Sequence, residues 1–319
     1  MNMFQKPKIA VIGAGMIGGN LAYMAAKKGL GDIVLFDIVE GLPQGKALDI
    51  LETTPIEKIN SNLIGTNNYE DIKDADVIII TAGIPRKPGM SRDDLLSTNA
   101  KIMAQVAENV KRYAPNSYVI VISNPLDAMV YLFYKISGFH KNRVMGMAGI
   151  LDASRFRAFI ALETGISVES ISAFVLGGHG DSMVPLPRYS YVGGVPLPHF
   201  PGMTSEKIES IVERTRKGGG EIVALLKTGS AFYAPAASAM AMTESIIRDQ
   251  KKVFPAAVYC EGEYGYNDLF IGLPAVFGGN GMEKIIEIEL EPNEKEALDK
   301  SAAAVESLKE NLKTLNFIT

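Results

Sequence analysis

Residues 8–37 read KIAVIGAGMIGGNLAYMAAKKGLGDIVLFD, and this stretch decides the fold. The short apolar run KIAVI (8–12) ends at a glycine-rich turn, and IVLF (33–36) is a second apolar run of similar length. The residues between the turn and Gly29 have helical spacing, so the stretch predicts strand, helix and strand. Such a unit folds with its two strands parallel and its helix packed across them.

The alternation of strand and helix continues to about residue 145. DADVIIITAG (74–83) and SYVIVISNP (117–125) predict two further strands, and their apolar character is typical of strands covered on both faces. Residues 99–115 between them carry apolar side chains every four positions, the spacing of an amphipathic helix. The sequence therefore predicts an α/β fold over residues 1–145, a Rossmann doubly wound parallel sheet with helices on both faces.

The second half, residues 146–319, has a different rhythm. Helical spacing is expected in LDASRFRAFIALETG (151–165), in a long segment interrupted at Gly218–Gly220, after Gly229, and in 293–315 with Asn293 and Glu296 as its cap. Strand-like runs are expected at 171–176, 253–260 and 284–290. This mixture predicts a mixed α+β domain that packs closely on the first.

Composition narrows the possible functions. Apolar residues make up 47% of the 319-residue chain, charged residues 21%, and the net charge is −4. These values are typical of a soluble globular protein, and without a basic excess we expect no nucleic-acid partner. No apolar run is long enough for a membrane span, and the N-terminus lacks a signal-peptide pattern. One cysteine, Cys260, and three scattered histidines predict a cytoplasmic protein with no disulfide and no metal site.

The glycine turn predicts a dinucleotide site. It contains Gly13, Ala14, Gly15, Met16, Ile17 and Gly18, and its glycines fit G-x-G-x-x-G. In that motif the glycines permit the turn, the approach of a pyrophosphate and close helix–sheet packing. Asp37 follows Gly18 by 19 residues, where a carboxylate binds ribose hydroxyls and repels a 2′-phosphate, so NAD is favoured over NADP. GLPQGKA (41–47) lacks the spacing and the Ser/Thr of a P-loop.

Histidine suits the proton transfer that accompanies hydride transfer at a hydroxyl carbon. His179, in LGGHGDS, follows a predicted strand and has small neighbours that let a substrate approach; a structural role is the alternative. In DASRFR, Asp152 and Arg155 lie three apart on one helix face. Asp152 would orient a histidine and Arg155 would grip a carboxylate, or the two form an ordinary salt bridge with each other.

Two further polar segments follow predicted strands. Asn124 ends a strand in ISNP, and open α/β sheets bind ligands at the carboxyl ends of their strands; Asn124 is otherwise a turn residue. GIPRKPGMSRDD (83–94) contains two prolines and is therefore a loop, with Arg86 and Arg92 six residues apart. It is either a solvated surface turn or a clamp that presents two guanidinium groups to an anion.

Seven segments together resemble the L-lactate/L-malate dehydrogenase family. They occur in order, at the family's spacing and over nearly the whole chain: GAGMIG, Asp37, TAGIPRKPGMSRDDLL, Asn99, ISNPLD, LDASRFR and GGHGDS. Within the family, the chain is most similar to the lactate-dehydrogenase-like malate dehydrogenases of bacteria. The resemblance implies reversible hydride transfer between L-malate and NAD⁺, a small dicarboxylate substrate, and a homodimer or homotetramer.

The resemblance also implies a role for each site residue. His179 would accept the proton in malate oxidation with Asp152 as its partner, and Arg155 would bind the carboxylate next to the reacting carbon. Arg92 would polarise the substrate carbonyl. The residues expected to contact NAD beyond the glycine turn and Asp37 are Asn99, Ile122, Ser123 and Asn124, the last of which would also touch the substrate.

Arg86 occupies the position that sets substrate specificity in this family, where lactate enzymes typically carry uncharged Gln. Oxaloacetate has a second carboxylate that needs a cation in a closed, water-poor site. With pyruvate bound, Arg86 would be buried without a partner, which costs several kcal/mol. One arginine would thus attract the dicarboxylate and reject the monocarboxylate.

Three alternatives remain open. A lactate or other 2-hydroxyacid dehydrogenase shares every segment except Arg86. An NAD-dependent glycosidase of similar fold would need a metal site with Cys and His near the substrate, whereas Cys260 lies far from GGHGDS in the sequence. A non-catalytic NAD-sensing module would usually carry an appendage that binds nucleic acid or a protein partner.

Overall fold

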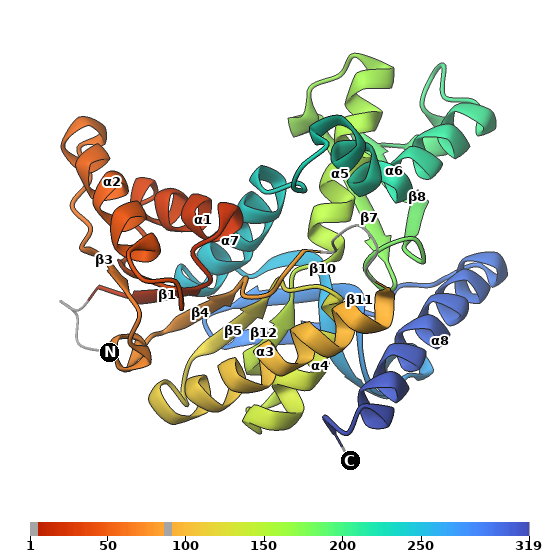
Figure 1. Cartoon of the computed structure of the whole chain (residues 1–319). Coiled ribbons are helices and arrows are strands. Elements are labelled where there is room, and N and C mark those ends of the chain that lie inside the picture. The colour runs from red at the N-terminus through yellow and green to blue at the C-terminus, as the bar shows by residue number, and fades with distance from the viewer. Residues whose placement is uncertain (1–5, 86–90, 319) are drawn as a thin grey trace.

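A nine-stranded sheet runs through the centre of the computed structural model, which describes residues 6–85 and 91–318 (Figure 1). Its parallel part consists of β1 (Lys8–Ile12), β2 (Asp32–Phe36), β3 (Leu63–Thr66), β4 (Val77–Ile80), β5 (Tyr118–Val121) and β6 (Val144–Gly146). Their order in space is β3-β2-β1-β4-β5-β6. This is the strand order of a doubly wound dinucleotide-binding sheet, so the fold class predicted from the sequence is confirmed.

The parallel strands separate two cores, one on each face of the sheet. The helices that cover them are α1 (Met16–Lys27) and α2 (Leu42–Glu57) on one face, and α3 (Arg92–Tyr113) and α4 (Leu126–Ser137) on the other (Figure 1). Successive residues of β1 point to opposite faces, so Ile9 and Val11 enter one core and Ala10 and Ile12 the other. Burial on both faces explains why these strands read as continuous apolar runs.

The second half of the chain adds three antiparallel strands to the same sheet: β10 (Lys252–Glu261), β11 (Asn267–Gly278) and β12 (Gly281–Ile285). β10 joins the parallel part beside β6, where Ala257 pairs with Gly146. A Cβ on Gly146 would lie 2.9 Å from that of Ala257, so the glycine permits this close pairing. One continuous sheet therefore crosses the predicted boundary at residue 145, and the division into two domains stays a prediction.

A smaller sheet contains β7 (Ile171–Leu176), β8 (Val184–Val192) and β9 (Val195–Pro196). It shares a third core with α5 (Gly149–Thr164) and α6 (Ser205–Leu226). The last two helices, α7 (Tyr233–Ile247) and α8 (Pro292–Thr314), pack beside α1 and α4 respectively (Figure 1). Within residues 6–85 and 91–318, no helix combines the length and apolar character that crossing a bilayer requires.

Two boundaries in the second half differ from the expectation. The break expected at Gly218–Gly220 is wrong, because α6 runs through the three glycines. Tertiary packing of its apolar face outweighs their poor helix propensity. α8 begins at Pro292, and its capping box is formed by Glu291 and Glu294 in place of the expected Asn293 and Glu296. Proline fits the first turn of a helix, which places the cap two residues earlier.

Other elements were missed or misplaced by sequence periodicity. The strand expected at 284–290 is misplaced, because β12 ends at Ile285 and residues 286–290 lie outside it. β11 was not expected from the sequence. α3 begins at Arg92, because Ser91 accepts the Asp94 N–H at 3.0 Å and caps the helix. The loop expected over 83–94 therefore ends at Ser91. The elements α2, β3, α4, β6, β8 and β9 were also missed. In the shortest of these, β3, β6 and β9, too few residues carry the periodicity.

Candidate active site

The glycine turn between β1 and α1 has the shape that a pyrophosphate site needs. Gly13 has a φ of 108°, and a Cβ there would lie 2.5 Å from Thr81 Oγ1. A Cβ on Gly18 would overlap the Gly13 carbonyl oxygen, so glycine allows α1 to start this close to β1. At Gly15, no atom of the described residues other than its two chain neighbours lies within 4 Å of the Cβ position. Phosphate oxygens can therefore approach the backbone N–H groups at the start of α1.

Asp37 closes this turn from the end of β2. Its Oδ2 accepts the Ala14 N–H at 2.7 Å, and its Oδ1 accepts the Val39 N–H at 3.0 Å. Each oxygen keeps a lone pair for a ribose hydroxyl. The neighbouring Ile38 is 82% exposed and offers no cation to a 2′-phosphate. Within the turn, Ala14 is buried, Ile17 packs against the core and Met16 is exposed. These residues fit NAD.

Lys46 was missed as a residue of this site, because GLPQGKA does not have P-loop spacing. In the structure, the Lys46 side chain lies against the glycine turn of GAGMIG. Its Nζ donates to the Gly15 carbonyl oxygen at 2.9 Å. A Cβ on Gly19 would lie 3.4 Å from Lys46 Cδ, so the fourth glycine of GAGMIGG leaves room for the lysine stem. Lys46 makes no ion pair with a carboxylate of the described residues. Its charge therefore acts on the region at the start of α1.

His179 and Asp152 come together from the loop after β7 and the first turn of α5. His179 Nδ1 lies 2.9 Å from Asp152 Oδ2, and Asp152 is 1% exposed. A carboxylate only accepts hydrogen bonds, so Nδ1 carries a proton and Nε2 is left for a substrate. Burial opposes the charged imidazole, but the Asp152 carboxylate outweighs burial and raises the pKa of His179 above its usual 6.5.

Arg155 shares the same carboxylate. Its Nη1 donates to Asp152 Oδ1 at 3.1 Å, and its side chain is 13% exposed. Its Nε is buried and has no hydrogen-bond partner among the described residues. The predicted salt bridge thus exists, but it uses a single donor of the guanidinium. The remaining donors are available for an anion beside His179, since a buried donor without a partner is costly.

Asp127 is a second residue that the sequence reasoning missed. It lies in the first turn of α4, is 3% exposed, and its Oδ2 accepts the His179 backbone N–H at 2.9 Å. Burial raises the pKa of Asp127 to about 6, and Oδ1 has no partner among the described residues. Its position directly after ISNPL was the available signal, because that segment ends a strand of the sheet.

The glycines beside His179 have different environments. A Cβ on Gly178 would lie 2.7 Å from Val305 and 3.3 Å from Asp127 Oδ2, so this glycine is needed for packing. At Gly180, with a φ of 124°, no described atom outside its two chain neighbours lies within 4 Å of the Cβ position. Gly180 thus fits the expectation that small neighbours leave room for a substrate, whereas Gly178 also has a role in packing.

Asn99 and the segment after β5 lie together. Asn99 is 2% exposed, and its amide donates to the carbonyl oxygens of Asn124 at 2.6 Å and Ile84 at 3.1 Å. The Ser123 hydroxyl donates to the Ala82 carbonyl oxygen at 2.5 Å. Ile122 is buried, whereas Asn124 is exposed at the end of the strand. Asn99 thus holds two strand ends together, and its contact with NAD stays a prediction.

The two loop arginines can be placed only in part. Arg86 lies outside the described residues. Arg92 is the first residue of α3, but its side chain is likewise outside what the structure describes. The start of α3 at the carboxyl end of β4 brings Arg92 to the edge of the sheet where Asn124 lies. The roles of both arginines stay predictions.

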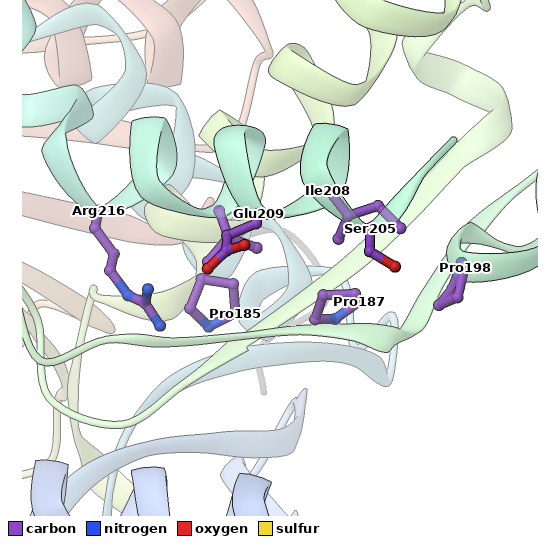
Figure 2. Close-up of a pocket in the computed structure, with 8 residues that line it drawn as sticks. Pro185, Pro187, Pro198, Ser205, Ile208, Glu209 and Arg216 are labelled. Carbon is purple, nitrogen blue, oxygen red and sulfur yellow. The ribbon is translucent and has the colours of Figure 1, made fainter. Parts of the chain in front are cut away.

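A groove of about 390 Å³ lies elsewhere, between α6 and β8 (Figure 2). Figure 2 shows Ile208, Glu209 and Arg216 of α6 facing Pro185 and Pro187 of β8. None of the described site residues lines it. Over residues 6–85 and 91–318, no group of three His, Cys, Asp or Glu side chains has the arrangement that holds a metal ion.

Comparison with known proteins identifies the family. Residues 7–146 match the lactate/malate dehydrogenase NAD binding domain, and residues 150–316 match the lactate/malate dehydrogenase alpha/beta C-terminal domain. The chain is 59% identical to the malate dehydrogenase of Methylobacterium radiotolerans over 309 residues, which is 96% of this chain and 97% of that protein. The chain therefore belongs to the lactate/malate dehydrogenase family. The family and the cofactor predicted from the sequence are confirmed, and the protein is an NAD-dependent oxidoreductase.

Solved structures do not separate lactate from malate enzymes by similarity of fold. The chain is similar to a malate dehydrogenase of Cryptosporidium parvum, with a TM-score of 0.95 and 48% identity over 97% of this chain and 100% of that one. It is as similar to a lactate dehydrogenase of the same organism in complex with lactic acid and nicotinamide adenine dinucleotide. That comparison has a TM-score of 0.94 and 49% identity over 98% and 99% of the two chains.

Proposed function

We propose that this protein is an NAD-dependent L-malate dehydrogenase, which interconverts L-malate and oxaloacetate. The observation that carries the proposal is the buried Asp152 carboxylate, which binds His179 and Arg155 at once. It places a proton acceptor beside a guanidinium with unused donors, as the oxidation of a 2-hydroxy acid requires. The 59% identity to a malate dehydrogenase supports malate as the substrate.

In this proposal each side chain has a defined task. Arg155 binds the carboxylate next to the reacting carbon. Nε2 of His179 accepts the hydroxyl proton, and Asp152 stabilises the resulting imidazolium. When bound, NAD⁺ accepts the hydride from that carbon. Arg92 stabilises the charge that develops on the substrate oxygen, and Asn124 contacts substrate and cofactor.

Substrate choice is assigned to Arg86. The malate and the lactate dehydrogenase of Cryptosporidium parvum are similar to the chain to nearly the same degree, so we assign the discrimination between their substrates to a local charge. A guanidinium at position 86 pairs with the second carboxylate of oxaloacetate and lacks a partner when pyruvate is bound.

A side-by-side assay of oxaloacetate and pyruvate, each with NADH and with NADPH, tests the proposal. The highest kcat/KM is expected for oxaloacetate with NADH. A higher kcat/KM for pyruvate would make the protein a lactate dehydrogenase. Preference for NADPH would overturn the role of Asp37 in cofactor choice.

The proposal also covers the roles of the two halves of the chain, the oligomeric state and the cellular location. Residues 1–145 supply the NAD side of the site and residues 146–319 supply its catalytic side chains. The protein forms a homodimer or homotetramer, as the family resemblance implies. Gel filtration with light scattering measures that state, and a monomer would contradict it. The protein acts in the cytoplasm, in the tricarboxylic acid cycle, where malate and oxaloacetate interconvert.

A further inference from the structure

Three consecutive glycines lie inside α6, at Gly218, Gly219 and Gly220. Glycine in a helix interior costs about 1 kcal/mol relative to alanine at each position. α6 lies beside α5, which carries Arg155 (Figure 1). Contacts of this glycine segment with α5 therefore bear directly on the substrate side of the site.

The clearance at the three glycines increases along the helix. A Cβ on Gly218 would lie 3.1 Å from Arg155 Cδ and 3.6 Å from its Nε. A Cβ on Gly219 would lie 3.6 Å from one terminal nitrogen of the same guanidinium, which is an ordinary contact. At Gly220, apart from the adjacent residues and the nearby backbone of α6 itself, no atom of the described residues lies within 4 Å of the Cβ position. The tightest position thus faces the stem of Arg155.

The partner that would have to move is the side chain of Arg155. Its Nη1 is held by Asp152, and its Nε is buried without a partner among the described residues. The Gly218 contact is with a flexible side chain, so α6 itself can accept a methyl group there. A methyl group at position 218 would therefore displace the guanidinium of Arg155, which lies on the opposite side of Asp152 from His179.

We propose that Gly218 is a positioning residue. Because it has no side chain, the Arg155 stem packs against α6 at this position, which we call the seat. This contact holds the guanidinium in place for the substrate carboxylate. The inference rests on the proposed function, in which Arg155 binds that carboxylate. Gly219 widens the seat, and Gly220 lies outside it. At Gly218 and Gly219, the helix thus gives up some stability and gains room for the side chain of Arg155.

The test compares three variants with the parent enzyme: Gly218→Ala, Gly220→Ala and Arg155→Lys. Gly218→Ala is expected to raise the KM for oxaloacetate about 5- to 10-fold, because displacements well below 1 Å already affect a bound substrate. Its NADH affinity should not change, and its melting temperature should be equal or higher, because alanine favours the helix. Gly220→Ala is the matched control, with the same gain in helix propensity and an unchanged KM.

Each outcome decides a separate point. An unchanged KM in Gly218→Ala, with a raised KM in Arg155→Lys, overturns the seat and leaves the proposed function standing. An unchanged KM in Arg155→Lys overturns the proposed role of Arg155 itself. If Gly218→Ala unfolds, Gly219→Leu decides, because its longer side chain extends beyond the ordinary 3.6 Å contact toward the guanidinium of Arg155. A KM raised about 2-fold or more supports the seat, and an unchanged KM overturns it.

Discussion

Oδ2 of Asp152 lies 2.9 Å from Nδ1 of His179, and this carboxylate is almost completely buried. The contact sets the tautomer of the imidazole and leaves Nε2 toward the substrate side. It also raises the pKa of His179, because the carboxylate stabilises the imidazolium more than burial destabilises it. The orientation and the protonation of the proposed base thus depend chiefly on the Asp152 carboxylate, with a smaller contribution from Asp127.

Asp152→Asn tests this dependence. Reduction of oxaloacetate needs protonated His179, so its kcat/KM falls as the pH rises through the pKa of the imidazole. Without the carboxylate, burial remains and lowers that pKa, so the falling limb moves to lower pH. We expect kcat to drop about 10²- to 10⁴-fold. A pH profile of kcat/KM measures both effects, and an unshifted limb would contradict the assignment.

Arg86→Gln tests substrate choice. Removing the cation should lose at least ~2 kcal/mol of transition-state stabilisation for oxaloacetate, about 30-fold in kcat/KM, and move preference toward pyruvate. Arg112→Gln, near the end of α3, removes the same charge far from the site and serves as control. An unchanged kcat/KM for oxaloacetate would show that another residue selects the substrate.

Asp127→Asn tests the buried carboxylate behind His179. Burial raises the pKa of Asp127 from 3.8 to about 6, so the folded chain binds this proton more tightly than the unfolded chain. Its contribution to stability is therefore lost as the pH rises from about 4 to about 6. Over that window, the stability of the parent relative to Asp127→Asn should fall, by up to about 3 kcal/mol.

Urea unfolding of both proteins at several pH values measures this difference. Comparing the change with pH cancels any constant effect of the new amide, which faces the side where Oδ1 has no partner among the described residues. A difference that stays constant with pH would mean that Asp127 titrates normally.

Lys46→Met tests the lysine beside the glycine turn. The change keeps the stem that packs on Gly19 and removes the charge and the donor to Gly15. We expect the Kd of NADH to rise about 2- to 5-fold, with kcat nearly unchanged, because one cation near a pyrophosphate contributes modestly in water. The difference should shrink at high salt. Lys300→Met on α8 is the control, and an equal Kd in both variants would remove Lys46 from the site.

Features carried by neighbouring residues were predictable from the sequence. The turn of GAGMIG, its place between strand and helix, and Asp37 at the next strand end depend on backbone conformation and short spacing. The continuous apolar runs of the strands likewise predicted a sheet buried on both faces. Spacing could not choose whether Asp152 pairs with Arg155 or with His179, and the structure shows both contacts.

The sequence by itself determined the doubly wound sheet and the NAD turn, and it predicted part of the set of polar residues that form the candidate site. Only the tertiary structure decided that Asp127 supports His179, that Lys46 reaches Gly15 and that Gly218 faces Arg155. These pairs lie 31 to 63 residues apart in the chain. Their contacts depend on how whole helices and strands pack, and packing leaves no local period in the sequence.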